Sequence, residues 1–317
     1  MKNKIKWIPL LAAWFAATVY AAPPVILCTV FPIYQITRNV TEGREGVRVE
    51  LLLPASLGCP HNYALTPQDM RKLIRAEVLV VNGLGLEEFL GAPVAQANPG
   101  LHIIDSAAGL PDLIMMAGRH HPHASHDEAC ADDHDHSTAV NPHPFASPRM
   151  SAQMARTIAR GLSQMDPDGA ERYAANAAAY VVRMDALATE LAELGRRLPH
   201  PRIIQPHGVF DYFARDGGLG IAAVLQPHGQ EPSAAEMIRM TRLIREQQVA
   251  AVIVEPQYSS KAGQTIARET GIPVIALDPG ASGPDGAPLD HFDTILRQNI
   301  QALRQGLLPE AAALDGD

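Results

Sequence analysis

Short apolar runs recur along the chain and are separated by segments that contain Pro, Gly and Asn. Runs of this length without strict alternation are typical of strands that are buried on both faces of a parallel sheet. The predicted strands cover residues 25–30, 47–53, 78–81, 102–104, 202–205, 222–225, 249–254 and 273–277.

Segments with helical spacing lie between these runs, and two of them begin with a capping box. Thr66 precedes Pro67 and Asp69, and Ser233 lies three residues before Glu236. The predicted helices cover residues 32–40, a segment from 67 onward, 148–164, 210–215, 233–248, 259–270 and 292–307. Strands that alternate with helices predict parallel α/β units.

The longest helical pattern covers residues 167–198. Asp166 and Pro167 form an expected N-cap and first turn, and Pro199 ends the pattern. At about 1.5 Å per residue such a helix spans roughly 45 Å, whereas globular helices average about 11–12 residues. We therefore expect a rigid helix that joins two bodies. A buried helix of one large domain, or two helices with a break near Met184, are the alternatives.

The predicted fold class is α/β, with two parallel-sheet lobes joined by the long helix. Residues 23–166 would form the N-terminal lobe and residues 199–317 the C-terminal lobe. Open α/β sheets bind ligands at the carboxyl ends of their strands. Two such edges facing each other predict a site in the cleft between the lobes.

The first 22 residues have the features of a secretory signal peptide. Three lysines precede an apolar segment, and Ala21 or Ala22 would be the last residue removed. The apolar segment is short for a membrane anchor, which needs about 20 residues. Cys28 is a poor lipid-anchor cysteine because Leu27 precedes it. We expect a soluble, exported protein.

Charge and cysteine usage narrow the possible partners. Without residues 1–22, 23 basic residues face 34 acidic ones, a net charge near −11. A net negative charge of this size argues against nucleic acid as a binding partner and is compatible with cation binding. Cys28, Cys59 and Cys130 allow one disulfide and one free thiol in an oxidising compartment, and the sequence leaves the pairing open.

Four residues in predicted loops, His61, His143, His207 and Asp278, each lie next to a proline. Proline restricts the local backbone and so helps to hold these side chains in place. Three imidazoles and one carboxylate suit a closed tetrahedral Zn²⁺ site, and they also accept Mn²⁺, Fe²⁺ or Co²⁺.

Other residues compete for these roles. His228 is an alternative to His207, and Asp278 could simply form a turn before Pro279. Glu255 is a rival carboxylate ligand or an acceptor that orients an imidazole. Cys59 is close to His61 but is more typical of a structural cysteine or a disulfide partner. A lone loop histidine is most often a surface residue, so each position alone is weak evidence.

Residues 119–137 have no apolar period and are rich in histidine and acid, as expected for a weakly ordered loop. The six histidines are candidate auxiliary metal ligands: His120, His121, His123, His126, His134 and His136. The alternative is a plain solvated linker.

Six segments together resemble the metal-binding solute-binding proteins of bacterial zinc/manganese ABC importers, over essentially the whole chain after residue 22. They are residues 59–69 (CPHNYALTPQD), 141–148 (NPHPFASP), 207–213 (HGVFDYF), 229–233 (GQEPS), 255–261 (EPQYSSK) and 277–279 (LDP). Two positions depart from the family pattern. Phe145 and Ala146 stand where a tryptophan is common, and Asn62 stands where some zinc members have an acid.

The resemblance implies that His61, His143, His207 and Asp278 bind the metal, and it favours His207 over His228. It also implies two lobes joined by a rigid long helix. A stiff connecting helix in turn predicts small lobe movement and no wide hinge closure. The loop at 119–137 resembles one that zinc members often carry, which favours Zn²⁺ over Mn²⁺.

The implied function is a monomeric periplasmic receptor, not an enzyme, that delivers zinc to the membrane permease of an ABC importer. A cell-envelope zinc hydrolase is an alternative, with Glu255 or Asp278 as base. It is disfavoured because the chain has neither His-Glu-x-x-His nor Gly-x-Ser-x-Gly. A surface adhesin is a lesser alternative.

Overall fold

The computed structural model describes residues 24–58, 60, 63–116, 140–199, 201–225 and 232–308. The predicted signal peptide at 1–22, His61, Cys59, His228 and the histidine-rich segment 119–137 lie outside the described residues. Within the described part, none of the helices is long and apolar enough to cross a membrane.

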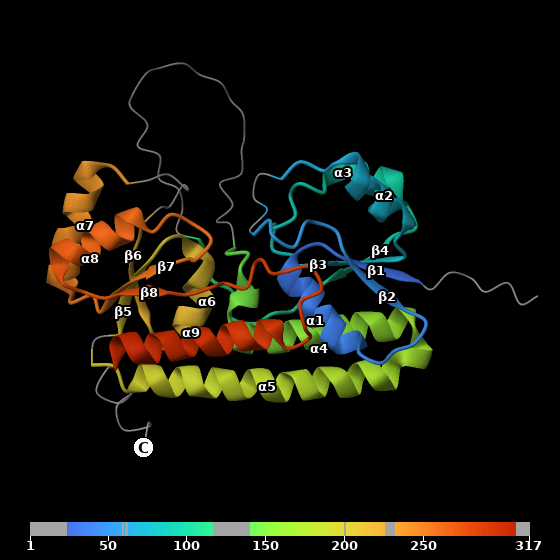
Figure 1. The fold of residues 1–317 in the computed structure, drawn as a ribbon. Helices are drawn as coiled ribbons and strands as arrows, with labels where there is room; N and C mark the ends of the chain where they lie inside the picture. Colours follow the sequence, from blue (N-terminus) through green and yellow to red (C-terminus); the bar gives the residue numbers. More distant parts are fainter. Residues whose placement is uncertain are drawn as a thin grey trace, which may run out of the picture.

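The first lobe contains a four-stranded, fully parallel sheet in the order β2-β1-β3-β4 (Figure 1). The central strands β1 and β3 consist of apolar residues and are buried throughout. Its strands are β1 (Val25–Cys28), β2 (Arg48–Leu51), β3 (Val78–Val81) and β4 (His102–Asp105). The helices around it are α1 (Phe31–Thr41), α2 (Pro67–Arg75), α3 (Gly91–Ala97) and α4 (Pro148–Met165).

The second lobe has another parallel sheet, in the order β6-β5-β7-β8. Its strands are β5 (Arg202–Gln205), β6 (Gly220–Val224), β7 (Ala251–Val254) and β8 (Val274–Ala276). Its helices are α6 (Asp211–Asp216), α7 (Ala234–Gln247), α8 (Lys261–Thr270) and α9 (His291–Leu307). The two sheets therefore share one topology, although the sequence shows no convincing internal repeat.

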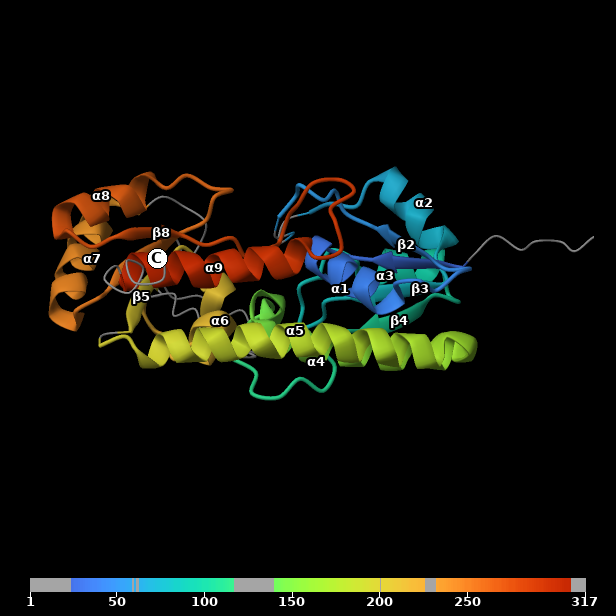
Figure 2. The same cartoon turned by 60° about the horizontal axis from the view of Figure 1, so that its bottom comes forward.

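The long helix is present as α5 (Ala170–Arg196) and runs without a break through Met184. It packs along α4 and contacts α1, α6 and α9, so it extends beneath both lobes (Figures 1 and 2). Asp166 is the N-cap, and Pro167 the first residue, of a 3-10 turn at 167–169 that leads directly into α5, but the Asp166 side chain makes no capping hydrogen bond. Its carboxylate instead accepts hydrogen bonds from Arg44 and Tyr173.

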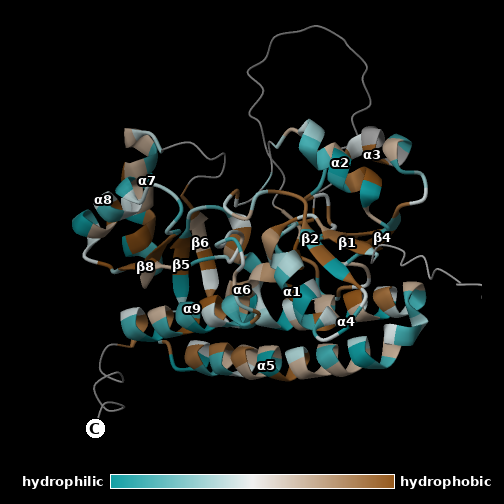
Figure 3. Ribbon diagram, turned by 45° about the vertical axis from the view of Figure 1, so that its right-hand side comes forward, coloured by the Kyte–Doolittle hydropathy of each residue, from teal (hydrophilic) through white to brown (hydrophobic). Residues whose placement is uncertain are grey.

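One continuous hydrophobic core links the two lobes. It includes both faces of the first sheet, the inner sides of α4 and α5, and one face of the second sheet. Hydrophobic residues accordingly gather on the strands and alternate with hydrophilic ones along α5 (Figure 3). The other face of the second sheet has its own small core beneath α7 and α8. Ile203 belongs to the shared core and its neighbour Ile204 to the small one, as the alternation of a strand requires.

The segment between β8 and α9 returns to the first lobe. Gly283 N donates to Ala55 O at 2.9 Å, and Asn39 Nδ2 donates to Leu289 O at 2.8 Å. The ring of His291 packs edge-on against Phe31, with centroids 5.8 Å apart. The lobes are thus held together by this crossing segment as well as by α5.

Candidate metal centre

The described candidates all lie in loops at the ends of regular elements. His143 precedes a 3-10 turn (Pro144–Ala146) that leads into α4. His207 follows β5, Glu255 follows β7 and Asp278 follows β8 by two residues. The three residues of the second lobe therefore lie beyond the carboxyl ends of three neighbouring parallel strands, where α/β sheets bind ligands.

His143 is buried, with 4% of its surface exposed. The Oδ1 atom of Asn141 lies 3.0 Å from both the backbone N and the ring Nδ1 of His143. The imidazole also packs edge-on against Phe145, with ring centroids 5.9 Å apart. Asn141 and Phe145 therefore hold the ring from two sides.

The imidazoles of His143 and His207 approach each other across the lobe boundary. Their centroids are 5.9 Å apart and the rings are nearly perpendicular, at 79°. One ion at about 2.0–2.1 Å from a nitrogen of each ring would place the ring centres roughly 5–6 Å apart. The pair is therefore spaced to share a metal ion.

His207 has a carboxylate partner. Its Nδ1 lies 2.8 Å from Oε1 of Glu255, whose side chain is almost fully buried while that of His207 is 25% exposed. A carboxylate beside one imidazole nitrogen fixes the ring and leaves the other nitrogen for a metal. Glu255 thus sits where an orienting acceptor should lie.

Asp278 is connected to the same loop through Gln257. Gln257 Nε2 and the backbone N of Gly280 both donate to Asp278 Oδ1 at 2.8 Å. The backbone of Asp278 exchanges two hydrogen bonds with the side chain of Asn299 on α9. Within the described residues, no three or more His, Cys, Asp or Glu side chains form a group that could hold a metal ion. The structure therefore brings His143, His207 and Glu255 close together without adding Asp278 to a ligand group.

The flanks of His61 are described, although His61 itself is not. Gly58 has a positive φ of 77°, and a Cβ there would lie 3.6 Å from the hydroxyl of Tyr258. The Tyr258 ring in turn packs edge-on against His207, with centroids 6.4 Å apart. The loop that leads to His61 therefore reaches the immediate neighbourhood of His207.

On the other side of His61, the predicted capping box at the start of α2 is confirmed. Thr66 accepts from the Asp69 backbone, and Asp69 accepts from the Thr66 backbone at 2.9 Å. The hydroxyl of Tyr63 also donates to Asp69, at 2.8 Å. This chain segment is therefore anchored two residues after His61.

A polar network between the lobes was missed by sequence reasoning. Asn141 Nδ2 donates to Gly208 O at 2.6 Å and to Asp211 Oδ2 at 2.8 Å. Gln205 Nε2 donates to the other oxygen of Asp211, and Tyr212 OH donates to Asn141 O at 2.9 Å. Most of these residues lie inside the motif segments 141–148 and 207–213, but nothing in their spacing predicts that they meet.

Comparison with known proteins identifies the family. A family model described as ZnuA, zinc-uptake complex component A, periplasmic, matches residues 26–306. The chain belongs to the ZnuA family. It is 28% identical over 287 residues to the high-affinity zinc uptake system protein ZnuA of Bacillus subtilis, covering 89% of this chain and 87% of that protein.

The ZnuA-family relatives also include longer proteins. The zinc-binding lipoprotein AdcA of Streptococcus pneumoniae (strain TIGR4) is 26% identical over 294 residues, which cover 92% of this chain. The chain spans only 57% of the length of AdcA.

Solved structures agree with the family assignment. A crystal structure of ZnuA matches with a TM-score of 0.72 and 30% identity, covering 90% of this chain and 99% of that one. FpvC of Pseudomonas aeruginosa, solved with Ni²⁺, matches with a TM-score of 0.74, 26% identity and 90% and 97% coverage. The two-lobed α/β fold is therefore the ZnuA fold.

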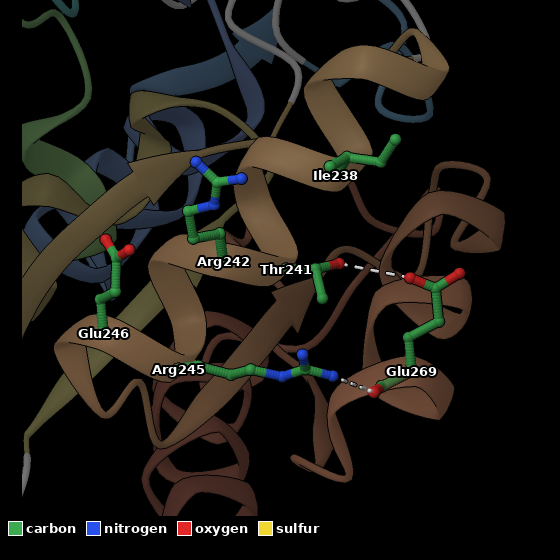
Figure 4. Close-up of a pocket in the computed structure, with 6 residues that line it drawn as sticks. All are labelled: Ile238, Thr241, Arg242, Arg245, Glu246 and Glu269. Atoms are coloured by element: carbon green, nitrogen blue, oxygen red, sulfur yellow. Dashed lines mark hydrogen bonds between the residues drawn. The ribbon is translucent and has the colours of Figure 1, made fainter.

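A surface hollow of about 450 Å³ lies between α7 and α8, and neither His143 nor His207 lines it (Figure 4). In it, Thr241 Oγ1 donates to Glu269 Oε2 at 3.3 Å, and Arg245 donates to Glu269 O at 3.4 Å. Its six lining residues include no histidine or cysteine, so it offers none of the nitrogen or sulfur ligands that zinc favours.

Proposed function

We propose that this chain is an extracytoplasmic zinc receptor that captures Zn²⁺ between its two lobes and delivers it to a membrane permease. Zinc is the transported substrate rather than a resident cofactor. The proposed ligands are His61 and His143 from the first lobe and His207 and Asp278 from the second. Glu255 is proposed to orient His207 and not to bind the metal.

The observation that carries the proposal is the histidine pair. Two imidazoles from different lobes lie with centroids 5.9 Å apart, and each has an oxygen acceptor near its Nδ1 atom. That arrangement directs the Nε2 atoms to a metal ion, as in many zinc sites. A closed site of four protein ligands suits capture, because catalytic zinc sites keep a position open for water or substrate.

Zinc is the first choice of metal because the named relatives ZnuA and AdcA are zinc uptake and zinc-binding proteins. Manganese is the second candidate, because FpvC has been solved with Mn²⁺ and is 26% identical to this chain. Three histidine ligands favour zinc chemically, since Mn²⁺ prefers carboxylate, carbonyl and water oxygens.

The remaining parts of the proposal concern the whole protein. Residues 1–22 would direct export to the periplasm. The mature protein would be a monomer without catalytic activity, and it would deliver zinc to the permease of an ABC importer. The lobes would comprise residues 23–166 and 199–317, joined by residues 167–198. The histidines between 119 and 137 would form a weak auxiliary zinc site.

Metal analysis and zinc titration of the purified mature protein test the proposal. The variants are His61→Ala/His143→Ala/His207→Ala and a chain without residues 119–137. We expect one tight zinc in the wild type, its loss in the triple variant and its retention in the shortened chain. Tight binding in the triple variant and its loss in the shortened chain would assign the site to residues 119–137 instead. A parallel Mn²⁺ titration decides between the metals.

A further inference from the structure

The side chain of Asn141 connects the two candidate histidine ligands. Its Oδ1 lies 3.0 Å from His143 Nδ1, and its Nδ2 donates at 2.6 Å to the carbonyl of Gly208, the residue after His207. The absence of a side chain at Gly208 permits this approach, because a Cβ there would lie 3.2 Å from Asn141 Nδ2. One amide group therefore contacts ligand segments from both lobes.

The partners of Asn141 determine which way its amide points. Nδ2 faces the Gly208 carbonyl and the Asp211 carboxylate, which can only accept hydrogen bonds when Asp211 is ionised. Oδ1 therefore faces His143, where it also accepts from the backbone N at 3.0 Å. The reverse orientation would place an oxygen against two acceptors and an NH₂ group against the His143 backbone N–H.

The amide orientation then determines the tautomer of His143. Because Asn141 Oδ1 can only accept, a hydrogen bond to it requires the proton of a neutral His143 ring to be on Nδ1. The lone pair is then on Nε2, the nitrogen that would bind zinc. In the other lobe, Oε1 of Glu255 lies 2.8 Å from Nδ1 of His207, but not in hydrogen-bonding geometry.

We propose that Asn141 is a positioning residue that sets the metal-binding tautomer of His143 and ties it to the loop that carries His207. This inference rests on the proposed function, because it assumes that both histidines bind zinc. Asn141 itself is not a ligand. Outer partners of this kind typically change metal affinity about 10–100-fold.

The test compares Asn141→Ala with Asn176→Ala in the full mature chain. Asn176 on α5 likewise donates two hydrogen bonds through its side-chain amide, in its case to the backbone carbonyls of Val40 and Glu42, so its variant loses two donated bonds at another place. We expect Asn141→Ala to bind zinc about 10–100-fold more weakly and Asn176→Ala to bind it as the wild type does. In ¹⁵N NMR of the metal-free protein, His143 should carry its proton on Nδ1 in the wild type and lose that preference in Asn141→Ala.

A second set of variants keeps the test valid if Asn141→Ala folds poorly. Asn141→Asp retains the acceptor for His143 but places a carboxylate against Asp211, so zinc affinity should fall while the Nδ1–H tautomer remains. In Asn141→Asp/Asp211→Asn the amide introduced at position 211 can donate to the carboxylate introduced at position 141, so affinity should recover in part. Recovery in the double variant supports a specific contact between these two side chains.

The proposal is overturned if Asn141→Ala binds zinc with wild-type affinity and His143 keeps its Nδ1–H tautomer. Single variants His143→Ala and His207→Ala separate this result from failure of the proposed function. If both lose tight zinc while Asn141→Ala keeps it, only the positioning role is wrong. If both retain tight zinc, the proposed ligand set is wrong and the positioning role falls with it.

Discussion

The two lobes have the same strand order but bury their sheets differently. Consecutive residues of β1 and β3 in the first lobe belong to one hydrophobic core, so both faces of these strands pack into that same core. In the second lobe, alternate residues of β5 and β7 belong to different cores. Side chains on the face toward α5 and α9 belong to the shared core. Those on the face toward α7 and α8 belong to a separate cluster, which contains seven buried residues among those that the structure describes.

The same contrast appears at the candidate metal centre. His143 of the first lobe is buried and faces a neutral amide, whereas His207 of the second lobe is partly exposed and faces a carboxylate. We therefore expect the first lobe, with α4 and α5, to be the more rigid part and α7 and α8 of the second lobe to form a less stable outer layer. Four experiments test this contrast.

Native-state hydrogen exchange should separate the two layers most clearly. The amides of α7 and α8 should exchange through local opening, because their own core is small and isolated from the shared one. Those of α4 and α5 should require global unfolding, which typically costs about 5–15 kcal/mol. We expect opening free energies lower by several kcal/mol in α7 and α8. Equal opening free energies and equal urea dependence in both layers would contradict a difference in local stability between them.

Glu255→Gln should weaken zinc binding by about 10–100-fold, because the neutral amide orients and polarises His207 less strongly than the carboxylate. Isothermal titration of zinc into the metal-free protein measures the change. Glu246→Gln is a control with the same chemical substitution at an exposed position on α7. If Glu255→Gln binds zinc with wild-type affinity, the Glu255 carboxylate does not orient His207 in the way proposed for Asn141 and His143.

Gly195→Ala should destabilise the joint between α5 and the second lobe. A Cβ at this position would lie only 1.6 Å from the backbone oxygen of Gly217, so the backbone of α5 or of the turn after α6 must move. Such overpacking costs typically about 1–3 kcal/mol, which exceeds the gain of roughly 0.5–1 kcal/mol from replacing a helical glycine.

Gly161→Ala is the matched control in the first lobe. Its Cβ would lie 2.9 Å from the Cδ1 and Cγ2 atoms of the buried Ile104, so a side chain, and not the backbone, is the nearest obstacle. Urea unfolding should therefore show a larger loss of stability for Gly195→Ala than for Gly161→Ala. Equal losses of unfolding free energy would indicate that the surroundings of Gly161 and Gly195 resist an added methyl group to the same extent.

The smallest effect concerns the junction of α4 and α5. The Arg44 guanidinium donates to Asp166 and lowers the pKa of that carboxyl from 3.8 to about 2. Since the folded-state pKa is depressed, this contact stabilises the fold above about pH 4 and is lost as the pH falls toward about 2. Urea unfolding of Asp166→Asn should show a weaker pH dependence than the wild type between these values. Identical slopes would contradict a stabilising role of the ion pair.

Local structure could be predicted wherever neighbouring residues determine it. The capping boxes at Thr66 and Ser233 begin α2 and α7 as expected, because each depends only on residues three positions apart. The helix α3 was missed because it is short, contains a glycine and a proline, and has Leu90 at its N-cap without a side-chain capping bond. Asp166 takes the predicted N-cap position, but its carboxylate binds Arg44, 122 residues away, instead of capping the helix.

From the sequence alone we predicted the α/β class, the long helix and the family, and we selected the candidate residues of the metal centre. These follow from periodicity, capping and short motifs, which act over a few residues. Only the tertiary structure decided which side chains meet. The contact of Asn141 with Gly208 joins residues 67 positions apart, and that of Glu255 with His207 joins two separate loops. Such contacts depend on how both lobes pack on α5, and no local pattern encodes that packing.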